Sequence, residues 1–313
     1  MRKPLGIPGQ RTVWPMIILF TLPAFLIYFR FLLLPIFQSI GVSFFTGSGM
    51  SPGEFAGLDN YRKLLTMNPY KTRFWNAFRN NLVFFGIVMV IQNGFGFFMA
   101  VLLTRPGKGI HTVRILTFLP TTLSVIVVGF LFNMMLNPTW GIFNELLSFL
   151  GLESLIRPWL GEPRTALTMI SIAVSWQFLG ESILFYAAGI DSINPEILEA
   201  GRIDGVNFLQ EIRHIILPSL IPIVGIVTIM IFMGDFTQFD IVYAMTTTRG
   251  NPVYGTDIFG SLFYRAAFQS PARDGWGVGM GATVSTIMSL LVFLGVSLWL
   301  FFFHRQKKRF FLE

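Results

Sequence analysis

Residues 194–222 have the sequence NPEILEAGRIDGVNFLQEIRHIILPSLIP, which is the most informative segment of the chain. It is a long polar interruption between apolar runs, and it is dense in helix signals rather than in loop residues. Asn194 is a suitable N-cap for a helix whose first residue is Pro195. We expect this helix to end near Gly205, at an Asp-Gly corner.

A second short helix is expected after the corner. It begins at Asn207, where Gln210 completes the spacing of a capping box, and it ends at Leu217 before Pro218. Four apolar side chains are expected to hold the two helices against their neighbours, namely Leu198, Ile203, Ile212 and Ile215. Four charged side chains are expected to face outward, namely Glu199, Arg202, Glu211 and Arg213. The segment is therefore predicted to be an ordered docking element without catalytic residues.

The composition places the chain in a membrane. Of its 313 residues, 53% are hydrophobic and 12% are charged, whereas soluble domains carry about 25% charged residues. There is no Cys, which excludes disulfides, Cys-ligated metals and thiol nucleophiles. We expect no metal site, because the three His residues are scattered outside the apolar runs. The net charge is +7, and Lys and Arg gather beside apolar runs. This distribution favours anionic lipid headgroups as partners, and we expect no nucleic acid.

Six apolar runs have the length of about 20 residues that a helix needs to cross a bilayer, roughly twice that of a barrel strand. They are 16–34, 81–103, 115–136, 166–188, 219–239 and 278–303. The first has no small-residue cleavage site, so we interpret it as an uncleaved span and not as a signal peptide. We therefore expect an all-α integral membrane protein with six transmembrane helices, forming one domain over residues 1–313 with a core from about 11 to 310.

The distribution of basic residues predicts the orientation. The N-terminus, the connection around Lys108 and the C-terminal tail are basic and nearly free of acid, which is typical of cytoplasmic segments. Both termini are then cytoplasmic, and residues 189–217 lie on the same side. The longer segments 45–79, 138–164 and 240–277 are expected outside.

The 194–222 segment also resembles a known motif, the EAA loop in the membrane subunits of bacterial ABC importers. The matching positions are Glu199-Ala200-Gly201, Asp204-Gly205, Arg213, Ile215, Leu217-Pro218 and Pro222. We call residues 194–222 the coupling loop. The sequence departs from the family pattern at Gly201, where a second Ala is usual, at Val206, which replaces a small residue, and at Ile212, where an aromatic is common.

The resemblance implies the fold of a type I ABC importer permease in the bacterial cytoplasmic (inner) membrane, with the coupling loop between transmembrane helices 4 and 5. It implies that the first short helix, the coupling helix, sits in a cleft of an ATPase subunit. The residues implied in that contact are Glu199, Ala200, Gly201, Arg202, Asp204 and Gly205. The outer segments would then be a landing surface for an extracytoplasmic binding protein.

The resemblance also implies partners. They are a second permease in a heterodimer, two cytosolic ATPase subunits that carry ATP and Mg, and the binding protein. The chain has no GxxxxGK[ST] sequence, so we expect it to hold no cofactor and not to be an enzyme. The resemblance is closest to the carbohydrate-uptake branch, which implies translocation of an oligosaccharide or a sugar derivative by alternating access.

Polar side chains inside the apolar runs are candidates for a sugar path. The candidates are Gln177, Glu181, Asp235, Gln238, Asn133 and Trp176. Carboxylates and amides pair with sugar hydroxyls, and aromatic rings pack on sugar C–H faces. The same polar residues could instead join helices by hydrogen bonds, and the sequence leaves both possibilities open. Gln92 and Asn93, followed by Gly94 and Gly96, are interpreted as close helix packing with amide support.

Three other functions remain open at this stage. One is an ABC importer for another solute, such as phosphate or a polyamine, although the runs hold few basic groups and few carboxylates. Another is an intramembrane enzyme, for which Glu181 and Asp235 are the sole candidate pair. The third is an ATP-independent secondary transporter, which would need no ATPase dock.

Overall fold

The computed structural model describes residues 10–47, 51–105, 107–247, 250–269 and 276–310. Within these residues the chain is helical, apart from loops and one isolated β-bridge between Phe45 and Phe55. The α-helices are α1 Gln10–Tyr28, α2 Leu34–Val42, α3 Asp59–Thr66, α4 Tyr70–Met89, α5 Gly96–Leu103, α6 Ile110–Phe118, α7 Val125–Met135, α8 Ile142–Phe149, α9 Pro163–Asp191, α10 Pro195–Ile203, α11 Phe208–Glu211, α12 Leu217–Thr237, α13 Asp240–Thr246, α14 Phe259–Tyr264 and α15 Val278–Phe310. This confirms the predicted all-α class.

Five helical stretches of the described chain are long and apolar enough to cross a bilayer. They are Pro15–Val42, Tyr70–Leu103, Pro163–Asp191, Phe208–Thr237 and Val278–Phe303. Three of them contain a π-helical turn: Phe29–Leu33 between α1 and α2, Val90–Phe95 between α4 and α5, and Ile212–Ile216 between α11 and α12. These five stretches overlap five of the six predicted runs.

The remaining run, 115–136, is not the single straight helix that its length predicts. Ile110–Thr122 and Val125–Met135 meet at 100°, and they make a sixth span only if the bent pair is counted as one. The bend follows Pro120, which lacks the N–H that an α-helix needs and whose ring crowds the preceding turn. The chain forms a 3-10 turn over Leu119–Thr122 and is then extended at Ser124 before α7 begins.

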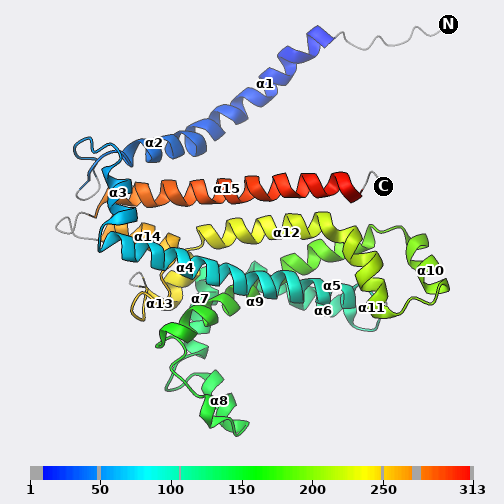
Figure 1. Cartoon of the computed structure of the whole chain (residues 1–313). Helices are drawn as coiled ribbons and strands as arrows, with labels where there is room; N and C mark the ends of the chain where they lie inside the picture. Colours follow the sequence, from blue (N-terminus) through cyan, green and yellow to red (C-terminus); the bar gives the residue numbers. More distant parts are fainter. Residues whose placement is uncertain (1–9, 48–50, 106, 248–249, 270–275, 311–313) are drawn as a thin grey trace.

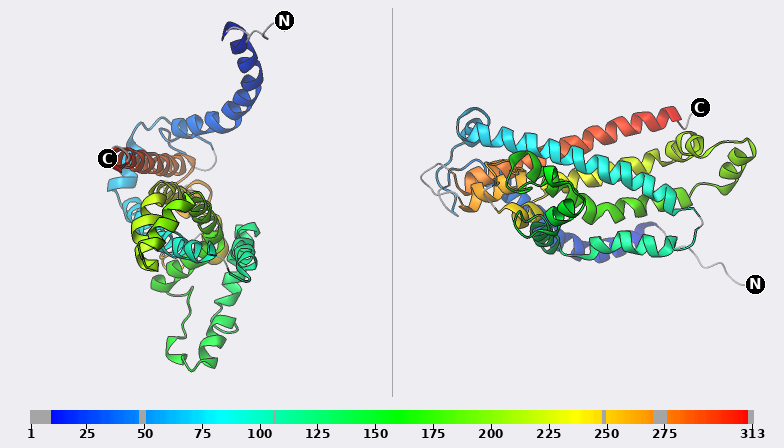
Figure 2. Two further views of the ribbon diagram at one scale, coloured as in Figure 1. Left: turned by 90° about the vertical axis from the view of Figure 1, so that its right-hand side faces the viewer. Right: turned by 90° about the horizontal axis from the view of Figure 1, so that it is seen from below.

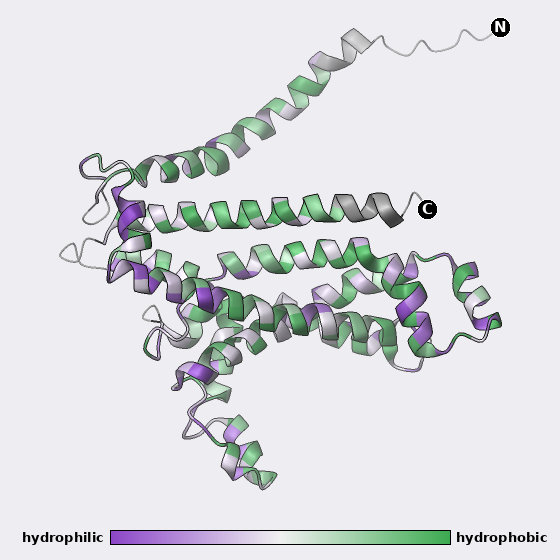
Figure 3. Cartoon of the chain, viewed as in Figure 1, coloured by the Kyte–Doolittle hydropathy of each residue, from purple (hydrophilic) through white to green (hydrophobic). Residues whose placement is uncertain are grey.

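The helices form an elongated bundle whose two ends differ (Figures 1 and 2). α10 and α11 lie at one end, and α3 and α14 lie at the other. The first described turn of α1 and the last described turn of α15 point toward the end of the bundle that carries α10. Apolar colour covers most of the length of the long helices, and polar colour appears on α3, on the first part of α4 and on α10 and α11 (Figure 3).

Two apolar clusters hold the bundle together. The larger one joins α5, α9 and α12 with α7 and α13, and fully buried Tyr186 lies within it. Small residues allow close approach there, because a Cβ on Gly96 of α5 would lie 3.2 Å from the Cβ of Ser182 on α9. The smaller cluster is aromatic and joins α4, α12 and α14, with the rings of Phe74 and Phe259 at 5.5 Å. α2 has no buried side chain, and α1 diverges from the bundle.

Candidate functional site

The coupling loop forms two helices with the caps that its sequence predicts. Asn194 accepts a hydrogen bond from the backbone N–H of Glu196 at 3.1 Å, at the start of α10. Asn207 and Gln210 form a reciprocal capping box, with N···O distances of 2.9 and 3.0 Å. Gly205 lies between the two helices with φ +78°, in the left-handed region that favours glycine. The predicted ordered corner is therefore confirmed.

The second helix of the loop does not end at Leu217, contrary to the prediction. α11 continues through a π-helical turn, Ile212–Ile216, directly into α12. Pro218 lies in the first turn of α12 and does not stop the helix. Because proline cannot donate a backbone hydrogen bond, the helix tolerates it where its hydrogen-bond pattern changes from π to α. The second helix of the coupling loop and the following span are thus one continuous helix, Phe208–Thr237.

Two side chains of the loop do not lie where the sequence predicted. Glu211 was expected to face outward, but it is only 8% exposed. Its carboxylate is 3.0 Å from a guanidinium nitrogen of Arg105 and 3.6 Å from one of Arg202. Ile203 was expected to hold α10 against its neighbours, but it is 86% exposed. Leu198 and Ile212 pack against the larger apolar cluster as expected, and the ion pairs with Glu211 add to this anchoring.

Arg105 connects the loop to the rest of the bundle. It follows α5, and besides pairing with Glu211 its guanidinium lies 4.0 Å from the ring centre of Phe208. An Arg over an aromatic face combines electrostatic attraction with packing. Arg105 and Glu211 are 106 residues apart in the sequence, so local sequence patterns could not predict their ion pair.

The motif residues on α10 separate into a buried and an exposed group. Gly201 is buried, and a Cβ there would lie 2.7 Å from the Cδ1 of Ile215, so the glycine allows the two helices to approach. Glu199, Ala200 and Asp204 are exposed. In the part of the chain that the structure describes, Glu199 has no ion pair. Ile197 and Ile203 on the same helix are also exposed, at 52% and 86%.

A cavity of about 400 Å³ lies between α9 and α12, and we call it the α9–α12 cavity. Three predicted path residues line it, namely Glu181, Asp235 and Gln238. Other polar lining residues are Gln92, Ser182, Thr237 and Asp240. Gln92, which the sequence suggested to be a helix-packing residue, is 5% exposed, lies in the π-helical turn Val90–Phe95 and also lines the cavity.

The other three predicted path residues are not among the residues that line the α9–α12 cavity. Gln177 is 1% exposed, and its amide donates to the carbonyl of Leu123 at 3.0 Å, at the bend before α7. Asn133 donates to the carbonyl of Met245 at 2.7 Å and so ties α7 to α13. Trp176 packs on Phe132 with ring centres 5.6 Å apart. These contacts match the helix-joining alternative that the sequence left open.

Asn93 has the helix-joining contacts that its position predicted. Its amide donates to the hydroxyl of Thr228 on α12 at 3.2 Å, and the hydroxyl of Tyr186 on α9 donates to its carbonyl oxygen. Asn93 thus links three helices inside the larger cluster. Such hydrogen bonds between helices typically contribute about 0.6 kcal/mol each in membrane proteins.

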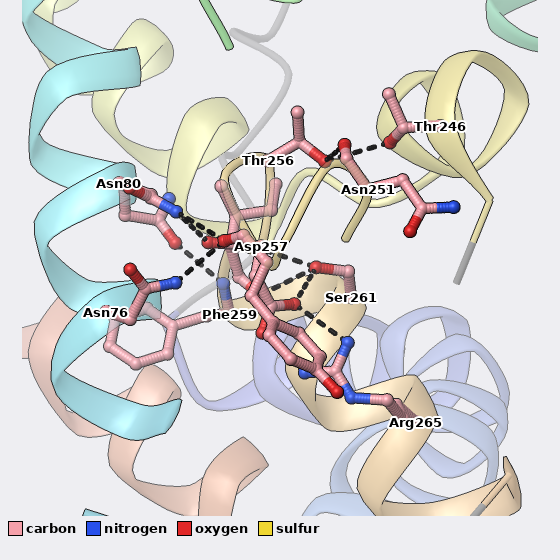
Figure 4. Close-up of polar contacts among 12 residues, drawn as sticks. Asn76, Asn80, Thr246, Asn251, Thr256, Asp257, Phe259, Ser261 and Arg265 are labelled. Carbon is pink, nitrogen blue, oxygen red and sulfur yellow. Dashed lines mark hydrogen bonds and ion pairs between the residues drawn. The ribbon is translucent and has the colours of Figure 1, made fainter. Parts of the chain in front are cut away.

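A second polar cluster lies at the opposite end of the bundle from the coupling loop, around residues 250–265 (Figure 4). Asp257 is fully buried, pairs with Arg265 through both carboxylate oxygens and accepts from the hydroxyl of Ser261 at 2.7 Å. Asn76 and Asn80 on α4 donate to backbone carbonyls of the same segment at 2.8 to 3.2 Å. The segment between α13 and α14 is therefore fixed against α4. The sequence alone does not reveal this cluster, because its members are distant in sequence and only the fold brings them together.

A bundle of membrane-crossing helices with a capped polar loop at one end and a polar cavity between two of its long helices has the architecture of a transport permease. Residues 92–309 match the family described as binding-protein-dependent transport system inner membrane component. The chain belongs to this family. Membership confirms the predicted class of importer permease.

The relatives are similar over nearly their whole lengths. The chain is 31% identical to the probable ABC transporter permease protein YurN of Bacillus subtilis, over 90% of this chain and 92% of that protein. It is 30% identical to the lactose transport system permease protein LacF of Rhizobium radiobacter, over 93% and 94%. It is 27% identical to the trehalose/maltose transport system permease protein MalF of Thermococcus litoralis, over 88% and 90%.

The fold has a counterpart among solved structures. The chain superposes with a TM-score of 0.77 on a chain from the crystal structure of a bacterial ABC transporter involved in the import of the acidic polysaccharide alginate, at 21% identity and over 94% and 96% of the two chains. At this identity the likeness establishes a shared fold. It confirms the predicted fold of an ABC importer permease.

Proposed function

We propose that the chain is the membrane-spanning permease of an ATP-driven importer that translocates a carbohydrate, an oligosaccharide or a sugar derivative delivered by an extracytoplasmic binding protein. The observation that carries the proposal is family membership over residues 92–309. Two relatives are named as transporters of lactose and of trehalose and maltose, which supports a carbohydrate as the solute. The α9–α12 cavity supports it further, because carboxylates and amides are suitable partners for sugar hydroxyls.

The proposed complex contains this chain and a second, similar permease, with two cytosolic ATPase subunits that bind ATP and Mg. It lies in the bacterial cytoplasmic membrane, with both termini of this chain in the cytoplasm. α10 docks on one ATPase subunit. Exposed Glu199 then makes a charge-assisted contact with a basic residue of that subunit, and Ile203 and Ile197 supply apolar contact area.

In this proposal, the two helices that flank the coupling loop transmit its movement to the cavity. α9 leads into the loop, and the helix Phe208–Thr237 leads out of it. The same two helices line the α9–α12 cavity. When ATP binding moves the docked loop, the walls of the cavity move with it, and the cavity opens alternately to the two sides of the membrane.

The test is uptake by the complete complex in liposomes. The complex is reconstituted with its binding protein outside and ATP inside, and a radiolabelled sugar that the binding protein retains is added. We expect uptake that requires ATP and stops when the ATPase is inactivated. Uptake by this chain alone without ATP would identify a secondary transporter and contradict the proposal.

A further inference from the structure

A groove of about 290 Å³ lies between α6 and α9, and we call it the α6–α9 groove. It is lined by Arg114, Thr117, Phe118, Gly180, Ile183, Leu184 and Ala187. Gly180, Leu184 and Ala187 follow one another at spacings of four and three residues, so they share one face of α9. Glu181 and Phe185, which line the α9–α12 cavity, lie on the other side of the helix. The groove is therefore turned away from the proposed solute path.

The walls of the groove are apolar, and its floor is closed by contact between the two helices. Ile183 is buried in the larger apolar cluster, whereas Phe118 and Leu184 are exposed and form the rim. A Cβ at Gly180 would overlap the backbone carbonyl of Thr117, so the glycine allows α6 and α9 to touch. The part of α9 that lines the groove rises by about 10 Å. This is a suitable slot for an extended apolar chain.

Arg114 is the charged residue among those that line the groove. Its Nε and Nη2 donate to the carbonyl of Leu103, the last residue of α5, at 3.0 and 2.7 Å. This cap holds the guanidinium in place, but a neutral carbonyl does not balance its charge. Within the described part of the chain Arg114 forms no ion pair, and its Nη1 has no hydrogen-bond acceptor. The positive charge is thus available to an anion from outside the chain.

The groove has its charge at the membrane surface and its apolar part deeper in the bundle. α5 ends and α6 begins at the end of the bundle that carries the coupling loop (Figure 1). Arg114 lies in the second turn of α6, and Phe118 lies one turn further into the bundle. A phospholipid has the same order, with its phosphate at the surface and its acyl chains toward the middle of the bilayer. Basic pockets between transmembrane helices are suited to anionic headgroups.

We propose that the α6–α9 groove binds an anionic phospholipid, with its phosphate on Arg114 and one acyl chain along Phe118 and Leu184. A guanidinium forms strong charge-assisted hydrogen bonds with phosphate oxygens. The inference goes beyond the proposed function. It needs the chain to lie in a membrane, as its family does, and it depends neither on the transported solute nor on the ATPase.

The test locates the lipid by photolabelling of the purified complex in nanodiscs, which consist mainly of phosphatidylcholine. A minor fraction of phosphatidylglycerol with a photoreactive acyl chain is added, or phosphatidylcholine with the same chain. Labelled peptides are quantified by mass spectrometry after illumination. The measured quantity is the ratio of labelling by the two lipids at residues 114–122 of the α6 segment. It is divided by the same ratio at residues 289–298 of α15, an apolar stretch without Lys or Arg.

We expect the normalised ratio to favour phosphatidylglycerol by about fivefold, the effect of one basic residue near an anionic headgroup. Arg114→Gln should bring the ratio close to one, and Arg114→Lys should retain most of the preference because it keeps the charge. Lys108→Gln is the matched control. It removes an exposed charge from the same connection but outside the groove, and should leave the ratio unchanged.

A second variant keeps the test decisive if loss of the cap on α5 prevents assembly of Arg114→Gln. Leu184→Trp fills the groove from an exposed position on α9. It should lower the labelling of residues 114–122 by both lipids and leave residues 289–298 unaffected.

Four results would overturn the lipid site. They are a normalised ratio near one in the wild-type complex, an equal loss in Lys108→Gln and Arg114→Gln, labelling of residues 114–122 that Leu184→Trp does not change, and no labelling there by either lipid. The last result would show that a partner subunit covers the groove. None of these measurements involves uptake, so the lipid site and the proposed function can fail separately.

Discussion

The guanidinium of Arg105 lies 3.0 Å from the carboxylate of Glu211, which joins the segment after α5 to the second helix of the coupling loop. Glu211 is nearly buried, so the pair is more protected from solvent than an ordinary surface ion pair. Its position allows it to hold the loop at a fixed angle to the bundle. The first prediction concerns this contact.

Glu211→Ala should leave Arg105 without its partner and destabilise the docked loop by about 1.5–3 kcal/mol, the range for hydrogen bonds to charged groups. The expected result is a lower ratio of sugar transported to ATP hydrolysed in the purified complex. The charge-exchanged pair Arg105→Glu with Glu211→Arg should recover part of the loss. Wild-type coupling in Glu211→Ala would show that the pair does not position the loop.

Gly205 has φ +78° at the corner between α10 and α11. Gly205→Val should strain the corner by about 1 kcal/mol or more, because a β-branched residue avoids this region. ATP hydrolysis stimulated by the binding protein should fall. Gly205→Asn is the matched control, since asparagine tolerates the left-handed region better. Equal loss in both variants would mean that something other than backbone strain is responsible.

Glu199→Ala should weaken the association of the permease with the ATPase subunits, because it removes an exposed carboxylate proposed to pair with a basic residue there. Insertion into the membrane should be unchanged. The measurement is the amount of ATPase subunit that co-purifies with the permease. Glu196→Ala, on the first turn of the same helix, serves as the comparison and should have the smaller effect. Full recovery of the ATPase subunits with Glu199→Ala would remove the basis for this contact.

Gln177 and Gln238 should behave differently. Gln177→Ala breaks the hydrogen bond to Leu123 at the bend of the third span. It should lower thermal stability of the complex by about 1–3 kcal/mol and leave the preference among sugars unchanged. Gln238 lines the α9–α12 cavity, so Gln238→Ala should change the relative uptake of two competing sugars instead. A changed preference among sugars in Gln177→Ala would indicate that Gln177 belongs to the solute path after all.

The orientation can be tested with single thiols in this Cys-free chain. A Cys at position 108 should be inaccessible to an impermeant reagent added to intact cells, because the connection between α5 and α6 is predicted to be cytoplasmic. A Cys at position 161 should react from outside. The reverse labelling pattern at either site would contradict the proposed topology.

Local signals in the sequence were sufficient for the features that depend on neighbouring residues. The cap at Asn194, the box formed by Asn207 and Gln210 and the turn at Gly205 each involve residues within four positions of one another. The apolar runs were also recognisable, because lipid requires about 20 apolar residues wherever a helix crosses the bilayer. These features could therefore be predicted from short segments of the sequence.

The features that the sequence did not predict depend on contacts between distant segments. Burial of Glu211 requires Arg105, and the cluster around Asp257 requires Asn80 on α4. The effects of Pro120 and Pro218 could not be predicted from the local sequence either. Pro120 accompanies a bend of 100°, whereas Pro218 lies inside a continuous helix. Whether a proline breaks a helix depends on the packing around it as well as on its own geometry.

The continuity of Phe208–Thr237 has a mechanical consequence. From Phe208 to Asp235 the helix rises about 40 Å at 1.5 Å per residue, so it acts as a stiff lever with the coupling loop at one end and the cavity at the other. A tilt of about 5° about its middle displaces each end by about 2 Å, which is enough to break a hydrogen bond of about 3 Å. In the proposed transport cycle, a small rotation of this helix at the coupling loop would therefore change the distances between the walls of the α9–α12 cavity.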